Sequence, residues 1–233
     1  MGVLVVCTLV VATQVVGFVE PAAAQPPTTT VLVPPNNATV SGTQVVFDAS
    51  ASSGTTQIQF VLIGGTPKRT VIATAAPTIY GWIAVWNSTT VPDGTYRLRS
   101  VAHANGVRAR SAAITITVNN PPPSTTVLIP SSGATVDTTQ TSLFDAGASP
   151  GVTQVLIEVA APGVYQETLT ATPTIYGWMA VLAGNPCPPN APGPCDFRTV
   201  PGTVVSVASY ANGVSAPSPT VNVTIFVFVG VGP

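Results

Sequence analysis

The chain has 233 residues, a formal net charge of -1 and only 6% charged residues. Its length leaves room for two domains of about 100 residues each. Strong helix formers such as Glu, Lys and Gln are scarce and β-branched residues are abundant, so the composition indicates an all-β protein and excludes a helical bundle.

Residues 1–24 are predicted to be a secretory signal peptide. An apolar run from Val3 to Val19 precedes the small residues Ala-Ala-Ala at 22–24, a site of the kind that signal peptidase cuts. No Lys or Arg precedes the apolar run, so an uncleaved anchor is the alternative. Both readings predict a protein that is secreted or held at the cell surface.

The next segment, residues 25–118, reads as a first domain made of strands. Short apolar runs alternate there with turn residues, as in a β-sandwich. The seven runs lie at residues 31–33, 45–47, 58–63, 71–74, 79–86, 96–102 and 114–118. No stretch keeps a helical period over three turns, and frequent Pro and Gly would break a helix. We therefore expect almost no helix.

A hairpin is predicted at Asn105-Gly106, because both residues tolerate the positive φ of a two-residue type I′ turn. This register places His103 opposite Arg108, so the basic side chains share one sheet face and the apolar ones share the other. This basic face consists of Arg97, Arg99, His103, Arg108 and Arg110. An extra residue, a bulge, is needed after the hairpin so that Ile114 turns inward again.

The domain occurs twice. The hexapeptide PTIYGW stands at residues 77–82 and again, unchanged, at residues 173–178, which is 96 residues later. Around it, TTVLVP at residues 29–34 is matched by TTVLIP at residues 125–130, and FDA and ANGV recur in the same order in both copies. The second domain covers residues 125–233. Between the copies, residues 119–124 contain three consecutive prolines and are expected to form a semi-rigid polyproline II linker.

The second copy carries an insert, residues 184–199, with the sequence CPPNAPGPC. After the signal segment, which contains Cys7, the only cysteines are Cys187 and Cys195. An even pair in an exported chain predicts a disulfide. A stiff loop of this kind is suited to recognising a partner. An equally good interpretation is that the disulfide only orders an otherwise flexible insertion.

The apolar run at the C-terminal end, residues 221–231, is too short to span a bilayer, which needs roughly 20 residues. Its alternation predicts a strand that completes the second domain. Val221, Val223 and Ile225 are expected to face the core, whereas Phe226 and Phe228 need cover elsewhere.

The repeat, which reads TTVLVP, FDAS, PTIYGW, VPDGTY and ANGV in the first copy, resembles the bacterial immunoglobulin-like domains that lie in tandem along exported surface proteins. The resemblance covers nearly the whole chain after the signal segment. It implies two immunoglobulin-like β-sandwich domains and a role as a spacer or adhesive module, and it supplies no catalytic residues. The insert in the second copy departs from the pattern.

No enzyme, cofactor or metal site is predicted. The single histidine, His103, has no Ser or Cys placed to form an activated pair. The acids do not cluster as calcium would require, since Asp48 and Asp145 occupy equivalent repeat positions. We interpret these two carboxylates as turn caps that accept backbone N–H bonds.

The alternating aromatic residues Tyr80, Trp82 and Trp86 have two interpretations. They could form a surface stripe that stacks on sugar rings, or they could belong to the core, where sandwiches usually place an indole. The core is favoured because Leu182 replaces Trp86 in the second copy. The predicted core aromatics are Tyr80, Trp82, Tyr176 and Trp178.

The basic face is the sharpest candidate for binding, because four guanidinium groups could neutralise the phosphates or sulfates of a polyanion. The alternative is a solvated face that keeps a β-rich protein soluble. The second copy is expected to lack this face. There the equivalent residues are predicted to be Val204, Ser206, Ser215 and Pro217.

The two domains have opposite charge. The first has six cations and two acids, a net +4, whereas the second has Arg198 and five acids, a net of −4. Expected partners are an anionic envelope polymer, another protein, or a second copy bound weakly head to tail; no specific nucleic acid is predicted. The sequence thus predicts an exported structural or adhesive spacer. The alternative is a polyanion- or carbohydrate-binding envelope protein that uses the basic face.

Overall fold

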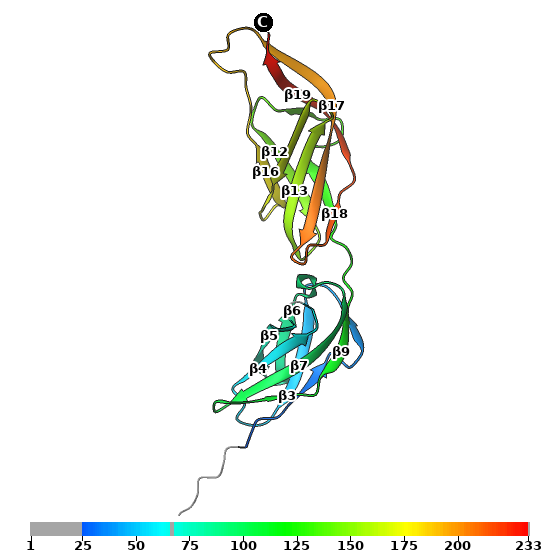
Figure 1. Cartoon of the computed structure of the whole chain (residues 1–233), viewed down its shortest axis with the longest axis vertical. Coiled ribbons are helices and arrows are strands. Elements are labelled where there is room, and N and C mark those ends of the chain that lie inside the picture. The colour runs from blue at the N-terminus through cyan, green and yellow to red at the C-terminus, as the bar shows by residue number, and fades with distance from the viewer. Residues whose placement is uncertain (1–24, 66–67, 233) are drawn as a thin grey trace, which may run out of the picture.

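The computed structural model describes residues 25–65 and 68–232. The predicted signal segment lies outside the described residues. Two sandwiches lie end to end along the long axis of the molecule (Figure 1). The described helical structure is a single 3-10 turn, η1 (Ser88–Thr90). Within the described ranges, no helix is long and apolar enough to cross a membrane.

The first sandwich contains nine strands, more than the seven predicted runs. They are β1 (Thr29–Val33), β2 (Ala38–Val40), β3 (Val45–Ala51), β4 (Gln57–Ile63), β5 (Arg69–Thr78), β6 (Gly81–Trp86), β7 (Gly94–Ala104), β8 (Val107–Arg110) and β9 (Ile114–Val118). Their hydrogen-bonded order is β1-β3-β6-β5-β4-β7-β9-β2, with β8 paired to β7. β5 joins the two layers, because its first part pairs with β4 and its end pairs with β6.

The second sandwich repeats this plan as two separate sheets. Its strands are β10 (Thr125–Ile129), β11 (Thr135–Asp137), β12 (Ser142–Ala148), β13 (Val152–Ala161), β14 (Tyr165–Thr170), β15 (Thr172–Pro173), β16 (Trp178–Leu182), β17 (Cys195–Tyr210), β18 (Ser215–Pro217) and β19 (Val221–Val231). The orders are β10-β12-β16-β15 and β11-β19-β17-β13-β14, with β18 paired to β17. Both halves are immunoglobulin-like β-sandwiches, which confirms the predicted fold class.

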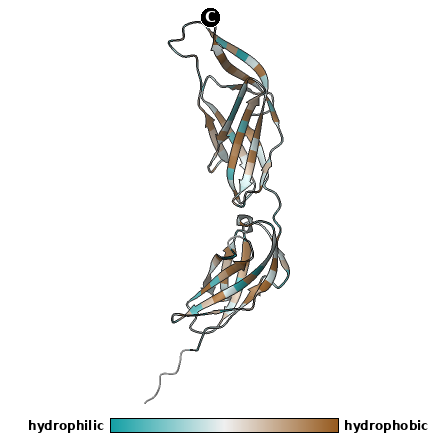
Figure 2. Cartoon of the chain, viewed as in Figure 1, coloured by the Kyte–Doolittle hydropathy of each residue, from teal (hydrophilic) through white to brown (hydrophobic). Residues whose placement is uncertain are grey.

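Each sandwich closes on its own apolar core, and apolar and polar residues alternate along the strands (Figure 2). In the first core, the ring of Phe47 packs 4.9 Å from Phe60 and 5.7 Å from Trp86, between centroids. In the second core, Phe144 is fully buried and Leu182 takes the place of Trp86. Burying one such large side chain stabilises a domain by about 1.5–3 kcal/mol.

The predicted hairpin joins β7 and β8. Asn105 and Gly106 have φ values of 49° and 77°, and His103 pairs with Arg108. The predicted bulge is also present. On β7, Val101 pairs with Arg110 and Leu98 pairs with Ile114. The two β7 residues are three positions apart, whereas their partners are four positions apart, so the partner segment contains one extra residue.

The matching hairpin of the second domain is one residue longer, and this corrects part of the predicted equivalence. Tyr210 donates its N–H to the carbonyl of Val214 across a three-residue loop. Compared with β7 in the first domain, the residues of β17 are therefore one position farther from the Asn-Gly pair of the loop. Ser206 occupies the place of Ser100, since both are buried and both pair with a threonine hydroxyl of the first strand.

Thr203 and Val205 consequently occupy the places of Arg97 and Arg99, and the expectation of Val204 and Ser206 at these places is wrong. Val204 and Ser206 are fully buried and face the core. Ser215 and Pro217 do match Arg108 and Arg110 by pairing. The conclusion that the second domain lacks a basic face still holds.

The insert extends the second domain into a two-stranded ribbon. Cys187 and Cys195 form the predicted disulfide, with their Cα atoms 6.0 Å apart. β17 begins at Cys195 and pairs along its whole first half with β19, so the end of the predicted insert is strand rather than loop. Figure 1 shows this ribbon rising beyond the sandwich toward the C-terminus.

The ribbon also covers the C-terminal phenylalanines Phe226 and Phe228. Val223 and Ile225 are buried in the core, as predicted, and Val221 is half-buried against it. The ring of Phe197 stacks 5.4 Å from Phe226 and lies 5.7 Å from Phe228, between centroids. The insert thus supplies the cover that these two rings need.

Candidate functional site

The candidate site lies on the outer face of the first sandwich, where β5, β4, β7 and β8 lie side by side. The alternation of β7 buries Leu98, Ser100 and Ala102 and directs Arg99 and His103 outward. β8 adds Arg108 and Arg110 to the same face, because they pair with His103 and Val101. The register therefore gathers the predicted basic face on one side of one sheet.

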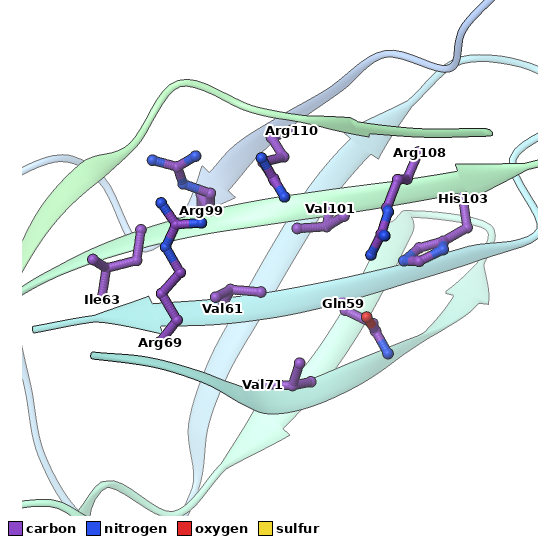
Figure 3. A pocket seen from close by; sticks show the side chains of 10 residues that line it. All are labelled: Gln59, Val61, Ile63, Arg69, Val71, Arg99, Val101, His103, Arg108 and Arg110. Carbon is purple, nitrogen blue, oxygen red and sulfur yellow. The ribbon is translucent and has the colours of Figure 1, made fainter. Parts of the chain in front are cut away.

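This face is hollowed. A cavity of about 130 Å³, called the basic hollow below, lies over the centre of the sheet (Figure 3). Its lining residues are Gln59, Val61, Ile63, Arg69, Val71, Arg99, Val101, His103, Arg108 and Arg110. Valine side chains form the floor and guanidinium groups stand around it. Arg97 does not line the hollow, although it points from the same face of β7.

The cations of the basic hollow have no acidic partners among the described residues. The one ion pair found in residues 25–65 and 68–232 joins Arg198 to Asp196, in the second domain, at 3.6 Å. Burial lowers the pKa of the Arg99 guanidinium, and the charges of Arg69, Arg110 and Arg97 lower it further. The protein thus holds like charges together without neutralising them.

Two donors of the hollow are buried without a partner. Nε of Arg99 and Nε2 of His103 are shielded from solvent and make no hydrogen bond with any described residue. Buried polar atoms of a folded protein nearly always have a partner. An acceptor that entered the hollow would meet donors that nothing else satisfies.

The sequence patterns do not indicate Arg69 or Gln59 as members of this site. The apolar run predicts a strand that begins at residue 71, whereas β5 begins at Arg69 itself. A strand extended by two residues would have put Arg69 on the face of Val71. Gln59 is the outward residue of β4 opposite Val101, and its position depends on strand order, which local patterns do not reveal.

The core assignment of two aromatics is wrong. Tyr80 is 80% exposed and Tyr176 is 78% exposed. The reason is a tight turn between β5 and β6. The prediction assumed that inward and outward side chains alternate without interruption through residues 79–86, but the turn breaks this alternation. The Thr78 hydroxyl donates to the carbonyl of Gly81 and accepts from the N–H of Tyr80. Trp82 and Trp178 lie partly buried against the two cores.

The interpretation of Asp48 and Asp145 as turn caps is also wrong. Both lie inside strands, β3 and β12, and each has a buried Oδ1 without a hydrogen-bond partner among the described residues. Each carboxylate packs instead against a glycine of the repeated hexapeptide. A Cβ added at Gly81 or at Gly177 would lie 2.5 Å from that oxygen. Across the described ranges, no three His, Cys, Asp or Glu side chains gather as metal ligands would.

Comparison with known proteins adds fold-level similarity only. No protein-family model and no curated protein matches the chain. Fibronectin(III)-like modules of Clostridium thermocellum CbhA align with 86% of this chain and 94% of their own at 16% identity and a TM-score of 0.31.

A tetra-tandem repeat from the extending region of a large adhesion protein aligns with 88% of this chain and 49% of its own, at 16% identity and a TM-score of 0.34. Tandem immunoglobulin domains of titin align with 84% and 96%, at 9% identity and a TM-score of 0.30. This similarity is too weak to carry an argument about function, and the fold assignment rests on the strand order and pairing.

Proposed function

We propose that the protein is an exported, non-enzymatic spacer whose two immunoglobulin-like domains are held in line by a stiff joint. The observation that carries this proposal is the short free length of the linker, which is fixed at both of its ends. Export is supported by the signal-like first segment and by the disulfide, which persists in oxidising compartments.

The N-terminal end of the linker is locked into the first domain. Asn120 is 9% exposed, and its N–H donates to Oδ1 of Asp93 at 2.9 Å. Its side-chain Oδ1 accepts from the N–H of Gly42 at 2.9 Å and from the hydroxyl of Ser88 at 2.6 Å. The linker is therefore already part of the fold before the first proline.

The C-terminal end of the linker is fixed in the same way. The N–H of Ser124 donates to Oγ of Ser149 at 3.0 Å, and Thr125 is buried in the second domain. Only Pro121, Pro122 and Pro123 remain between the two anchors, and proline fixes φ near −65°. A segment this short and this restricted has little freedom to bend.

The domains also contact each other directly. The side-chain amide of Asn212, at the tip of a hairpin of the second domain, donates to the carbonyl of Val91 at 2.9 Å. Gly151 lies so close to the first domain that a Cβ there would be 2.8 Å from Cγ2 of Thr43 and 3.0 Å from Oγ1 of Thr89. These contacts support a joint that resists rotation as well as bending.

The joint predicts that Gly151→Ala will widen the distribution of interdomain distances, because the added Cβ pushes the domains apart. Spin labels at Ile79→Cys and Ile175→Cys would report it, since both side chains are 91% exposed. Gly54→Ala is the matched control. Gly54 occupies the equivalent turn with a φ of +81°, but nothing lies within 4 Å of its Cβ position.

Both substitutions place alanine at a positive φ, so both carry the same local strain. A distribution that stays narrow for Gly54→Ala and broadens for Gly151→Ala supports the joint. Equal distributions in all three proteins, or a broad one in the parent, would mean that the contacts at Gly151 do not hold the domains.

A second function, binding of an anionic envelope polymer, is favoured by the unpaired cations of the basic hollow. Four arginines line the hollow and Arg97 stands beside it on the same sheet face, in a domain whose net charge is +4. Such a face attracts polyanions over about 10 Å at 0.1 M salt. The acidic second domain of a neighbouring molecule is the other partner that this charge would fit, through head-to-tail association.

Retention on a column that carries an anionic polysaccharide tests this second function. We expect retention that falls steeply as salt rises, and a loss of most of it when Arg97, Arg99, Arg108 and Arg110 become serine. Light scattering of the protein alone at low salt separates the two partners. Retention that does not change with the four substitutions would contradict polyanion binding by the basic face, and only the spacer function would remain supported.

A further inference from the structure

We propose that the basic hollow binds one tetrahedral dianionic group, a phosphate monoester or the free phosphate or sulfate ion, rather than serving as a diffuse patch of charge. This inference rests on the polyanion-binding function proposed above and names the group that is recognised. The group would be carried as a substituent of an envelope polymer or arrive as the free ion. The two sources share the chemistry and differ in what is attached to it.

Guanidinium groups from three strands gather at one end of the basic hollow. Arg69 from β5 and Arg99 from β7 point toward each other, Arg110 from β8 lies next to them, and Arg108 and His103 lie at the other end (Figure 3). Three strands that are separate in sequence thus deliver guanidinium groups to one place. Burial lowers the pKa of Arg99 first, and the repulsion between these charges lowers it further. A bound dianion would convert this repulsion into attraction.

Two buried donors line the basic hollow. Nε of Arg99 and Nε2 of His103 face no acceptor among the described residues. His103 can donate from Nε2 in one neutral tautomer as well as in its charged form. The two residues are four positions apart on β7, so an anion beside Arg69, Arg99 and Arg110 would accept from Nε of Arg99 and would not reach His103. The valine floor formed by Val61, Val71 and Val101 lowers the local dielectric and strengthens such charge-assisted bonds.

The size of the basic hollow suits a small group. Its volume is about 130 Å³, which admits one small oxyanion together with water. A polymer that lies over the open side of the hollow could therefore insert a charged substituent into it.

The number and direction of donors favour a tetrahedral group over a carboxylate. One guanidinium already satisfies both oxygens of a carboxylate in a bidentate pair. Here donors approach from three strands, and a phosphate monoester offers three terminal oxygens and about −1.5 to −2 charges. Charge and geometry both match the dianion better than a single carboxylate.

The test measures binding to the full chain by calorimetry and by the shift in thermal unfolding, with ionic strength held constant by chloride. The probes are inorganic phosphate, sulfate, acetate, a hexose 6-phosphate and the free hexose. We expect phosphate and sulfate to bind and to raise the unfolding temperature, and acetate to do neither. Equal binding of the hexose phosphate and phosphate indicates a polymer substituent; binding of phosphate alone indicates the free ion.

Variants locate the site. Arg99→Ser and Arg110→Ser should each weaken phosphate binding by about tenfold or more, because each removes a charge-assisted donor. Arg110 is exposed, so its variant keeps the fold intact should Arg99→Ser disturb it. Arg97→Ser is the matched control. It removes the same charge from the same strand face outside the hollow and should change affinity less than about twofold.

Acetate that binds as tightly as phosphate, or Arg97→Ser that weakens binding as much as Arg110→Ser, would overturn the site. In that case salt-dependent retention on an anionic polysaccharide would still support diffuse polyanion binding. No ion binding together with no retention would overturn the site and the polyanion function alike, and would leave the spacer function untouched.

Discussion

Asn120→Ala is expected to lower the free energy of unfolding of the first domain by about 3 kcal/mol. The Asn120 side chain makes four hydrogen bonds, to the backbone and hydroxyl of Ser88, to Gly42 and to Asp93. Each buried partner left unpaired costs about 1–3 kcal/mol. Urea unfolding of the full chain, followed by the fluorescence of the first domain's tryptophans, measures the effect.

Asn119→Ala is the control for this prediction. Asn119 is exposed and contributes its backbone N–H to the carbonyl of Val40, which alanine retains. We expect a change within about 0.5 kcal/mol for this surface substitution. A decrease in the free energy of unfolding as small as this for Asn120→Ala would contradict the role of Asn120 in fixing the linker to the first domain. The stiffness of the linker would then need another explanation.

Gly177→Ala is expected to destabilise the second domain by about 3 kcal/mol, and Gly81→Ala the first domain by about 2 kcal/mol. Their φ values of +147° and +144° lie in a region that is nearly restricted to glycine and costs about 1–3 kcal/mol for other residues. The added Cβ also meets the paired carboxylate. At Gly177 it meets in addition the carbonyl of Ala146 at 3.1 Å.

A second substitution separates the two causes. Asp48→Ala should restore the part of the stability of Gly81→Ala that is lost to the steric clash. The three atoms nearest to the added Cβ at Gly81 all belong to the Asp48 side chain. Asp145→Ala should recover less at Gly177, since the backbone carbonyl stays in place. Thermal unfolding of the single and double variants measures this coupling. Recovery that is equal at the two sites would contradict the role assigned to the carbonyl.

The exposed neighbour of each glycine provides the control. Tyr80→Ser and Tyr176→Ser should change stability by no more than about 0.5 kcal/mol, because both side chains stand in solvent. Within the repeated hexapeptide, structure therefore accounts for the threonine, the glycine and the tryptophan. Nothing in the fold explains why the isoleucine and the tyrosine are the same in both copies.

Local patterns in the sequence predicted the features that depend on neighbours along the chain. The turn at Asn105-Gly106, the facing of Arg99 and Arg108, and the bulge before Ile114 all follow from a period of two and one turn type. The disulfide followed from the count of cysteines. These features need no knowledge of how distant strands meet.

Features that depend on distant contacts were missed. Tyr80 was placed in the core because a turn of four residues interrupts an alternation that continues in the sequence. Arg69 and Gln59 join the basic hollow only because β5, β4 and β7 are neighbours in the sheet. The role of Asn120 depends on Ser88, which is 32 residues away in the chain. Periodicity carries no information on such pairings.

The stiff in-line joint is tested most directly by residual dipolar couplings of the backbone amides of the full chain in a dilute aligned medium. Two domains that are fixed to each other must align as one body. We predict that a single alignment tensor fits the couplings of both domains, with the relative orientation seen in Figure 1. Separate tensors of clearly different magnitude would show that the domains reorient independently and would contradict a stiff spacer.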